Sequence, residues 1–504
     1  MRTIRSIRFA LILSLAMFSS GTFAQGYDLR FNMKGNKDTM MFLVKYMFDQ
    51  QYIVDTCKNI KNGAVRFHGK EDLDKGVYTL VSEGKSIYFD LFVNENQKFT
   101  YNCDNSDIVN SMKVTGSKEN ELFVSYIKYI TNKNQEFNKF RDESKKKSKE
   151  DSAKFIQDKI KLMNEDVKKF DTDFMAKTKG SYLHDVLNLK SEKEPAEIPK
   201  AKNGRPDSVY QYYYYKSHFF DGVDFTDDRI IRTPFFDDRV KRYFESVILQ
   251  HPDTIIQEID KVLGRSKQDG LVYNLLIGHF TYKYEQSKVM GFDKIFVHIC
   301  DKYIISGKAK QVYTDETVKK IKERADIMRN LLLESKAPEL YMIDTIYGKQ
   351  VMKMGFDTAK TSQGVTELYY KNVEKLTPMF KTLYTVKSKF TVLVFWSVDC
   401  GHCQTEIPKL NEELKELKGK IDFTTFAVYT KEDFEAWRKF ILEKKLDFVN
   451  VFDPIHINNL KEKYDIYSTP VIYILDKDKK IKAKRLGSEQ VIDMLKFLDG
   501  LDKK

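Results

Sequence analysis

A pair of cysteines between an apolar strand and an amphipathic helix is the strongest constraint on the fold of this 504-residue chain. Residues 391–396 form a short apolar run that predicts a buried strand, and residues 404–417 show helical periodicity with apolar side chains on one face. Between them lies Cys-Gly-His-Cys, from Cys400 to Cys403. The free amides and the dipole of a helix N-terminus stabilise negative charge. We therefore expect Cys400 to ionise readily, with Cys403 placed to close a small disulfide ring.

Strands and helices continue to alternate after this junction. Further strands are predicted at 423–429, 448–452, 471–475 and 480–485, and helices at 433–445 and 488–498. The resulting order, β-α-β-α-β-β-β-α, predicts an α/β sheet with helices on its faces. We assign residues 336–504 to this domain.

The two preceding segments have different patterns. Residues 25–116 contain short β-branched and aromatic runs separated by Gly, Asn, Asp and Lys, which predicts an antiparallel β-sandwich. Residues 117–335 have helical periodicity, with a proline-containing linker near 190–206. The expected fold class is therefore multidomain: an N-terminal antiparallel β-sandwich, a central all-α region and a C-terminal α/β domain.

The N-terminus predicts export. Three arginines within the first eight residues precede an apolar run at 9–18, and small residues follow, which is typical of a secretory signal peptide at 1–24. The expected location is the periplasm or cell envelope. The formal net charge of +12 is modest for this length, and an exported protein does not meet the genome, so we expect no nucleic-acid partner. Because no other apolar run reaches the length of a membrane span, we do not expect an integral membrane protein.

The cysteine pair has three interpretations: a redox-active dithiol, half of a zinc site, or a static disulfide. No second C-x-x-C or H-x₃₋₅-H exists to complete four zinc ligands, so we expect neither a metal nor a cofactor. A static disulfide with so short a ring would add little stability. The redox-active pair is favoured, with Cys400 as the nucleophile and Cys403 as the resolving thiol. Gly401 and His402 would tune the potential, since a cationic or hydrogen-bonding His402 favours the thiolate.

The other three cysteines lie outside this motif. Cys103 alternates with polar residues in its predicted strand and should face the core. Cys57 lies in the same β-rich segment, so that a disulfide between Cys57 and Cys103 is one alternative and two free thiols the other. Cys300 follows an isoleucine in an apolar helix, which predicts a buried small hydrophobic residue.

Residues from about 337 to 504 resemble the thioredoxin superfamily, specifically the TlpA/ResA-like periplasmic thiol–disulfide oxidoreductases. The motifs that carry the resemblance are Ala337–Leu340, Phe395–Cys403 (Phe-Trp-Ser-Val-Asp-Cys-Gly-His-Cys), Glu406, Pro408 and Ser468–Val471 (Ser-Thr-Pro-Val).

The resemblance implies roles for several residues. Cys400 would be the nucleophile, and Pro470 a cis proline opposite the disulfide. Thr469 would offer backbone hydrogen bonds to a substrate strand, and Trp396 completes the predicted substrate-binding set. Glu406 matches a buried acid near the resolving cysteine and would accept its proton if burial raises its pKa; a solvated helix residue is the alternative.

The sequence departs from the family pattern in three places. Asp399 stands where many relatives have Trp, and its carboxylate could oppose thiolate formation. Val394 stands where thioredoxins keep a buried Asp. Residues 354–384 form an insertion before the core strand. In addition, Cys-Gly-His-Cys itself resembles the motif of protein disulfide isomerases, so isomerase or oxidase activity is a further alternative.

The N-terminal segments also resemble known domains. Residues 27–117, ending in Val114–Ser117, resemble a β-sandwich of unknown function that precedes TlpA-like domains. Residues 225–229 and 233–236 resemble part of a helical domain of unknown function found in the same arrangement. Neither resemblance assigns an activity.

The favoured function is an exported thiol–disulfide oxidoreductase of the reductase or isomerase type. Its expected partners are cysteine-containing envelope proteins as substrates and a redox partner that the sequence does not identify. The alternative is a non-enzymatic envelope adaptor whose thioredoxin-like domain is vestigial. A thiol peroxidase ranks last, because the chain lacks a Thr-x-x-Cys arrangement that would activate peroxide.

Overall fold

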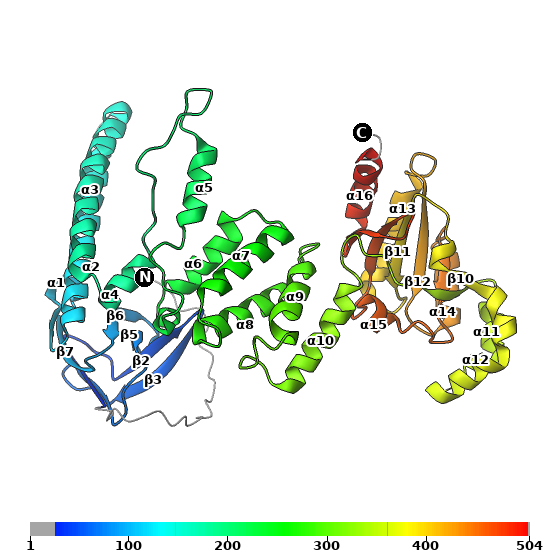
Figure 1. Ribbon diagram of the computed structural model, residues 1–504, viewed down its shortest axis with the longest axis horizontal. Coiled ribbons are helices and arrows are strands. Elements are labelled where there is room, and N and C mark those ends of the chain that lie inside the picture. The colour runs from blue at the N-terminus through cyan, green and yellow to red at the C-terminus, as the bar shows by residue number, and fades with distance from the viewer. Residues whose placement is uncertain (1–25, 147, 360, 502–504) are drawn as a thin grey trace. The chain divides into compact units, whose positions relative to one another are not determined.

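The computed structural model describes residues 26–146, 148–359 and 361–501. It contains two compact units (Figure 1), one formed by residues up to 250 with 257–275, and the other by 251–256 with the chain from 276 onward. The predicted signal peptide at 1–24 lies outside the described residues. Within the described ranges, no helix combines the length and apolar character needed to cross a bilayer.

The first unit contains two four-stranded sheets, ordered β4-β1-β7-β8 and β3-β2-β5-β6. Their strands are β1 (Tyr27–Lys34), β2 (Met40–Met47), β3 (Gln50–Lys58), β4 (Ala64–Gly69), β5 (Gly76–Ser82), β6 (Ile87–Val93), β7 (Lys98–Asp104) and β8 (Lys113–Thr115). Buried and exposed residues alternate along β4 and β7, and the buried ones pack against residues of the other sheet. The described pairings are antiparallel as expected, except that β1 pairs in parallel with β7.

The remaining elements of the first half of the chain are helical. They are α1 (Ile108–Ser111), α2 (Lys118–Ser144), α3 (Lys149–Thr178), α4 (Tyr182–Asn188), α5 (Ser208–His218), η1 (Asp228–Arg232), α6 (Phe236–Arg242), η2 (Tyr243–Val247), α7 (Pro252–Arg265) and α8 (Leu271–Glu285). Ser117 caps α2 by accepting a hydrogen bond from the amide of Asn120. The Asn120 side chain bonds to both backbone groups of Phe92, which fixes the start of α2 on β6. Residues 190–206 contain no helix.

The second unit is built on a seven-stranded sheet with the order β10-β9-β13-β12-β11-β14-β15. Its strands are β9 (Tyr341–Asp344), β10 (Phe380–Thr382), β11 (Phe390–Trp396), β12 (Phe423–Tyr429), β13 (Val449–Phe452), β14 (Val471–Asp476) and β15 (Ile481–Lys484). The three neighbours β11, β12 and β13 are parallel, and the other pairs are antiparallel. This is the α/β domain that the sequence predicts.

Helices surround this sheet. They are α9 (Asp293–Ile299), η3 (Cys300–Ile305), α10 (Asp315–Arg329), α11 (Gly348–Val351), η4 (Met352–Phe356), α12 (Ser362–Leu376), η5 (Thr377–Met379), η6 (Leu383–Thr385), α13 (Gly401–Lys415), α14 (Phe434–Glu443), α15 (Leu460–Tyr464) and α16 (Ser488–Leu501). The insertion predicted at 354–384 contains α12 and β10. The predicted element order is present, with α15 as an additional short helix between β13 and β14.

The core lies on both faces of the central strand β11, whose seven residues are all buried. Val392 and Val394 pack into one hydrophobic cluster with residues of α13, α14 and α16, while Leu393 and Phe395 pack into another. Alternate side chains of a strand point to opposite faces, so β11 holds both layers together. The chain leaves this well-packed strand directly toward the cysteine pair.

Helix α10 belongs to the second unit and contacts the residues around its sheet. Arg324 of α10 pairs with Asp465, the residue that follows α15, and Arg485 contacts the same carboxylate at 2.5 Å. Leu331, just after α10, belongs to the second hydrophobic cluster of the sheet. The compact unit that contains the cysteine pair therefore includes helices that begin well before residue 336.

Candidate active site

The dithiol lies at the start of α13. Cys400 is the N-cap residue of that helix, and its carbonyl accepts the first helical hydrogen bond, from the amide of Gln404 at 3.1 Å. Cys400 is partly exposed, whereas Cys403, one turn into the helix, is buried. Both are free thiols in this structure. One sulfur is therefore accessible and the other is shielded behind it.

The surroundings of Cys400 favour its thiolate. Partial burial opposes ionisation, but hydrogen bonds from the side chains of Thr469 and Cys403 and from the amides of Cys403 and His402 outweigh it, and the pKa of Cys400 lies below that of an ordinary thiol. The two amides belong to the first turn of α13, where no carbonyl of the helix is available to them. The helix N-terminus thus supplies two of the donors that hold the negative charge.

Cys403 has the opposite character. Burial raises the pKa of its thiol to about 11, and the neighbouring Cys400 adds to the shift. Hydrogen bonds with the Thr469 side chain and the Ser397 backbone work in the other direction but do not prevent it. The two sulfurs therefore differ in exposure and in acidity, as the two members of an exchange dithiol should.

A loop before β14 faces the cysteines. The Thr469–Pro470 peptide bond is cis, and the Cys400 thiol donates a hydrogen bond to the Thr469 carbonyl at 3.1 Å. Both residues are partly exposed. The loop thus lies directly beside the accessible sulfur.

Three family models match the chain. Residues 27–123 match DUF4369 and residues 131–330 match DUF5106, both domains of unknown function. Residues 378–484, which include the dithiol and the cis-proline loop, match the AhpC/TSA family. The chain carries a C-terminal thioredoxin-like domain of the AhpC/TSA family.

Parts of the chain are also similar to solved structures of other proteins. A domain of a possible thiol-disulfide isomerase from Cytophaga hutchinsonii is 36% identical over 34% of this chain and 97% of its own, with a TM-score of 0.26. The thioredoxin domain of a thiol-disulfide oxidoreductase from Bacteroides vulgatus is 24% identical over 33% and 97%, with a TM-score of 0.25. A thioredoxin-like protein from Bacteroides caccae is 16% identical over 60% and 98%, with a TM-score of 0.41. No curated protein matches the chain.

The charge of Asp399, next to the dithiol of the thioredoxin-like domain, is compensated. Asp399 is exposed, and Lys431 Nζ lies 3.6 Å from its Oδ2. A hydrogen bond from the Ser397 side chain, helped by Lys431, lowers the pKa of Asp399. The carboxylate that could oppose the Cys400 thiolate therefore has a cation beside it. Sequence reasoning gave no role to Lys431, although it follows β12 and so lies at the same edge of the sheet as Cys400.

The two residues between the cysteines are exposed. A Cβ at Gly401 would meet no atom within 4 Å, so steric crowding does not dictate glycine there. His402 is exposed on the first turn of α13, and its amide faces the sulfur of Cys400. Their predicted influence on the redox potential stays a prediction.

Trp396 and Glu406 are placed differently from the open surface around Cys400. Trp396 is fully buried and packs against Tyr429 and Phe440, so the structure gives no support to its predicted contact with substrate. It instead anchors the end of β11. Glu406 is half-buried on α13 and accepts a hydrogen bond of 2.5 Å from Ser488 Oγ at the start of α16. Its predicted proton transfer with Cys403 stays a prediction.

The other cysteines lack the features of the dithiol. Cys103 is buried, as the alternation predicts, and burial raises the pKa of its thiol to about 11. Cys57, in the other sheet, is also a free thiol, so the pair is not joined in this structure. Cys300 is fully buried, and burial raises its pKa strongly. Among the described residues, no cluster of three or more His, Cys, Asp or Glu could hold a metal ion.

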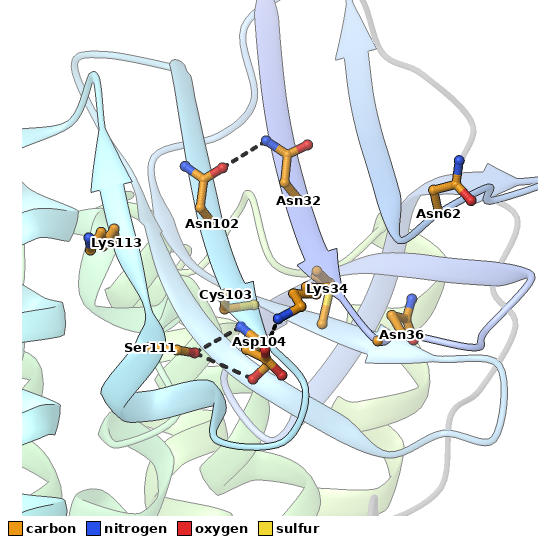
Figure 2. Close-up of a pocket in the computed structure, with 11 residues that line it drawn as sticks. Asn32, Lys34, Asn36, Asn62, Asn102, Cys103, Asp104, Ser111 and Lys113 are labelled. Carbon is orange, nitrogen blue, oxygen red and sulfur yellow. Dashed lines mark hydrogen bonds and ion pairs between the residues drawn. The ribbon is translucent and has the colours of Figure 1, made fainter.

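The β-domain contains a recess of about 720 Å³ (Figure 2). Its walls include Cys103 and several polar side chains, some of which bond to one another. Asn32 donates to Asn102 at 2.9 Å, and Lys34 pairs with Asp104 at 3.1 Å. Because these groups are already partnered and the thiol is held neutral, the recess lacks the reactive character of the Cys400 site.

Proposed function

We propose that the protein is an exported thiol–disulfide oxidoreductase that exchanges disulfides with cysteine-containing proteins of the periplasm or cell envelope. Cys400 is the nucleophile and Cys403 the resolving thiol. The observation that carries the proposal is the asymmetry of the pair: a partly exposed sulfur with a lowered pKa next to a buried sulfur with a raised pKa. Exchange requires a thiolate that can reach a disulfide and a second thiol that waits until the first has reacted.

The first step forms a mixed disulfide. The thiolate of Cys400 attacks one sulfur of a substrate disulfide, a bond forms between Cys400 and that sulfur, and the other substrate sulfur leaves as a thiolate. As the negative charge leaves Cys400, the helix amides lose their anionic partner. The Thr469 carbonyl and Pro470 lie beside the reacting sulfur, where an extended substrate segment could pair with the backbone.

The second step releases the product. The Cys403 thiol loses its proton and attacks Cys400 Sγ, so that the mixed disulfide breaks and the second substrate sulfur leaves as a thiolate. The substrate has then gained two electrons, and the protein holds a Cys400–Cys403 disulfide. We assign the proton of Cys403 to Glu406, which lies three residues further along α13. The reverse sequence oxidises a substrate dithiol, and the relative potentials set the direction.

The cellular setting is part of the proposal. The predicted signal peptide at 1–24 supports export, and an oxidising compartment is where disulfides persist. A turnover cycle needs a redox partner that re-reduces or re-oxidises the dithiol. Gly401 and His402 would set the potential at which that partner works, with His402 making the pair more oxidising than proline would.

Two assays test the proposal. Reduction of insulin by a dithiol, and oxidation of a reduced peptide, should both be accelerated by the wild type and not by Cys400→Ser. Absence of turnover with an intact, accessible dithiol would contradict the proposal and favour a non-enzymatic adaptor. Cys403→Ala should accumulate mixed disulfides through Cys400, and mass spectrometry of these adducts from cell-envelope extracts would name the substrates.

A further inference from the structure

The edge of the sheet that carries the dithiol extends well beyond it. Strands β11, β12 and β13 are parallel neighbours, so the loops that follow them lie at one edge. Cys400 follows β11, and the amide of Thr430, directly after β12, donates to the Trp396 carbonyl at 2.9 Å. Residues 454–457 follow β13 at the same edge.

Side-chain contacts connect these loops. Lys431 lies 3.6 Å from Asp399, which is adjacent to Cys400. The next residue, Glu432, contacts His456 Nε2 at 3.5 Å. These two contacts, made by the neighbouring residues Lys431 and Glu432, connect Asp399 beside the dithiol to the loop after β13.

A cavity of about 880 Å³, lined by both polar and apolar side chains, lies beside the loop after β13. One wall is the loop after β13, and the other is the insertion that precedes β11, with η4 and α12 (yellow in Figure 1). Its apolar lining includes Phe356, Val365, Tyr369, Tyr370, Ile455 and Ile457. Just before this insertion, α11 packs closely on α14, because a Cβ at Gly348 would lie 2.3 Å from Phe434 Cε2.

Part of this apolar lining is open to solvent. The exposed fraction is 71% for Tyr370 and 40% for Ile457. Exposed aromatic and aliphatic side chains grouped around a cavity are typical of a binding surface. The volume is in the range of ligand-binding clefts and suits a short peptide segment rather than a folded partner domain.

The charged side chains of the cavity favour a cationic occupant. Asp357 and Glu432 line it, and no lysine or arginine does so among the lining residues that the structure describes. Lys431, next to Glu432, is paired with Asp399. The imidazole of His456 faces Glu432, whereas Asp357 is exposed at the rim. The chain as a whole has a formal net charge of +12, which makes this acidic rim a local feature.

We propose that this cavity binds an apolar or aromatic side chain of the substrate polypeptide, on a segment that also carries lysine or arginine, close to the cysteine that exchanges with Cys400. The inference rests on the proposed function and adds a substrate class to it. The cavity would hold the client segment while the sulfurs react, so that clients with this pattern react faster than small disulfides of equal intrinsic reactivity.

A binding measurement tests the cavity without using the redox reaction. The protein would carry Cys400→Ser and Cys403→Ser, and the probe would be a fluorescein-labelled peptide in which Phe, Leu and two arginines surround a serine in place of the reacting cysteine. We expect saturable binding by fluorescence anisotropy. A second peptide with Ser and Glu in place of Phe, Leu and Arg should bind at least about tenfold more weakly, the effect of losing one buried side chain.

Matched variants locate the binding. Tyr370→Ser combined with Ile457→Ser should weaken binding of the Phe-Leu-Arg peptide about tenfold. Leu442→Ser removes a side chain that is 67% exposed on α14 and does not line the cavity, so it should leave binding unchanged. Circular dichroism spectra and thermal melts would verify that all variants fold.

The outcomes separate this inference from the proposed function. Equal affinity for both peptides, or no effect of the double variant, would overturn the cavity assignment even if insulin reduction is intact. A dimer of the full chain that the double variant dissociates would assign the cavity to a second copy and also overturn it. Specific peptide binding without any turnover by the wild type would overturn the oxidoreductase function and the assignment of the bound segment as its substrate.

Discussion

The hydroxyl of Thr469 offers a direct test of how the site stabilises the Cys400 thiolate. Its side chain is among the groups that lower the pKa of Cys400, while its backbone carbonyl contacts the same sulfur. Thr469→Val removes the hydroxyl and keeps the shape and the carbonyl. A hydrogen bond to a charged group contributes about 1.5–3 kcal/mol, and partial exposure reduces this to about 1 kcal/mol. The thiolate fraction at a pH well below the pKa should then fall about fivefold.

The rate of alkylation reports this change with a characteristic reversal. A more basic thiolate is more nucleophilic, with a Brønsted coefficient of about 0.4–0.5, so a fivefold loss of thiolate gives a net loss of about two- to threefold at low pH. Above the pKa, where ionisation is complete, the variant should react about twofold faster than the wild type. The assay is iodoacetamide modification of Cys400 against pH in a Cys403→Ala background, followed by peptide mass spectrometry.

A matched control uses the same substitution on the first turns of α13. The Thr405 hydroxyl bonds to the carbonyls of Gly401 and His402 and is exposed, so Thr405→Val should leave the pH profile unchanged. An unchanged profile for Thr469→Val, or a slower reaction at every pH, would refute the argument that its hydroxyl stabilises the thiolate.

Three further predictions concern stability. Because the pKa of Cys400 is lowered in the folded protein, its ionisation contributes stability above the ordinary thiol pKa of about 8.5. This stability is lost as pH falls through the pKa of Cys400. Urea unfolding of Cys403→Ala, compared with the double variant Cys400→Ser/Cys403→Ala, should show the loss. The raised pKa of Cys403 lowers stability at high pH, so reduced Cys400→Ser should lose stability relative to that double variant between about pH 8.5 and 11. A stability difference that does not change with pH would contradict the claim that burial raises the pKa of Cys403. Gly348→Ala should lower the free energy of unfolding by about 1–3 kcal/mol, because its Cβ would meet the Phe434 ring. Gly500→Ala should not lower it, because a Cβ there would meet no atom within 4 Å. Equal effects of the two substitutions would show that the close approach is unimportant.

The sequence predicts the thioredoxin-like domain well because its signals are local. The apolar run of β11, the Cys-Gly-His-Cys tetrapeptide and the amphipathic pattern of α13 follow one another directly, and each requires only neighbouring residues to be recognised. The cis proline at Pro470 was expected from the family resemblance that Ser468–Val471 helps to carry, and the structure contains it.

The elements that were not predicted depend on distant partners or on unusual turns. Strand β3 was not predicted, because its residues are half-buried along most of its length and the turn before it uses Phe48 with a φ of 53°, a residue type that does not indicate a turn. Strand β9 is formed by pairing with β13 and β10, which lie far along the chain. Helix α15 has five residues and lies between two left-handed residues, Asn459 and Asp465.

Prediction of the candidate site from the sequence has the same limit. The cysteines and the facing loop are visible as motifs, but the pairing of Asp399 with Lys431 requires the register of parallel strands. The sequence also does not reveal that Trp396 is fully buried, since a tryptophan at a strand end can face either the core or solvent. The cavity between the insertion and the loop after β13 joins segments that lie far apart in the chain, which no local pattern indicates.

The ionisation of Cys400 is the central claim, and the ultraviolet absorbance of its thiolate measures it most directly. Reduced Cys403→Ala protein would be titrated against the double variant Cys400→Ser/Cys403→Ala, so that the difference spectrum belongs to one sulfur. Cys403→Ala removes one donor but keeps the Thr469 hydroxyl and the two helix amides, so we predict that this difference reaches half its maximum at a pH below the ordinary thiol pKa of about 8.5. A midpoint at or above that value would contradict the proposed nucleophile.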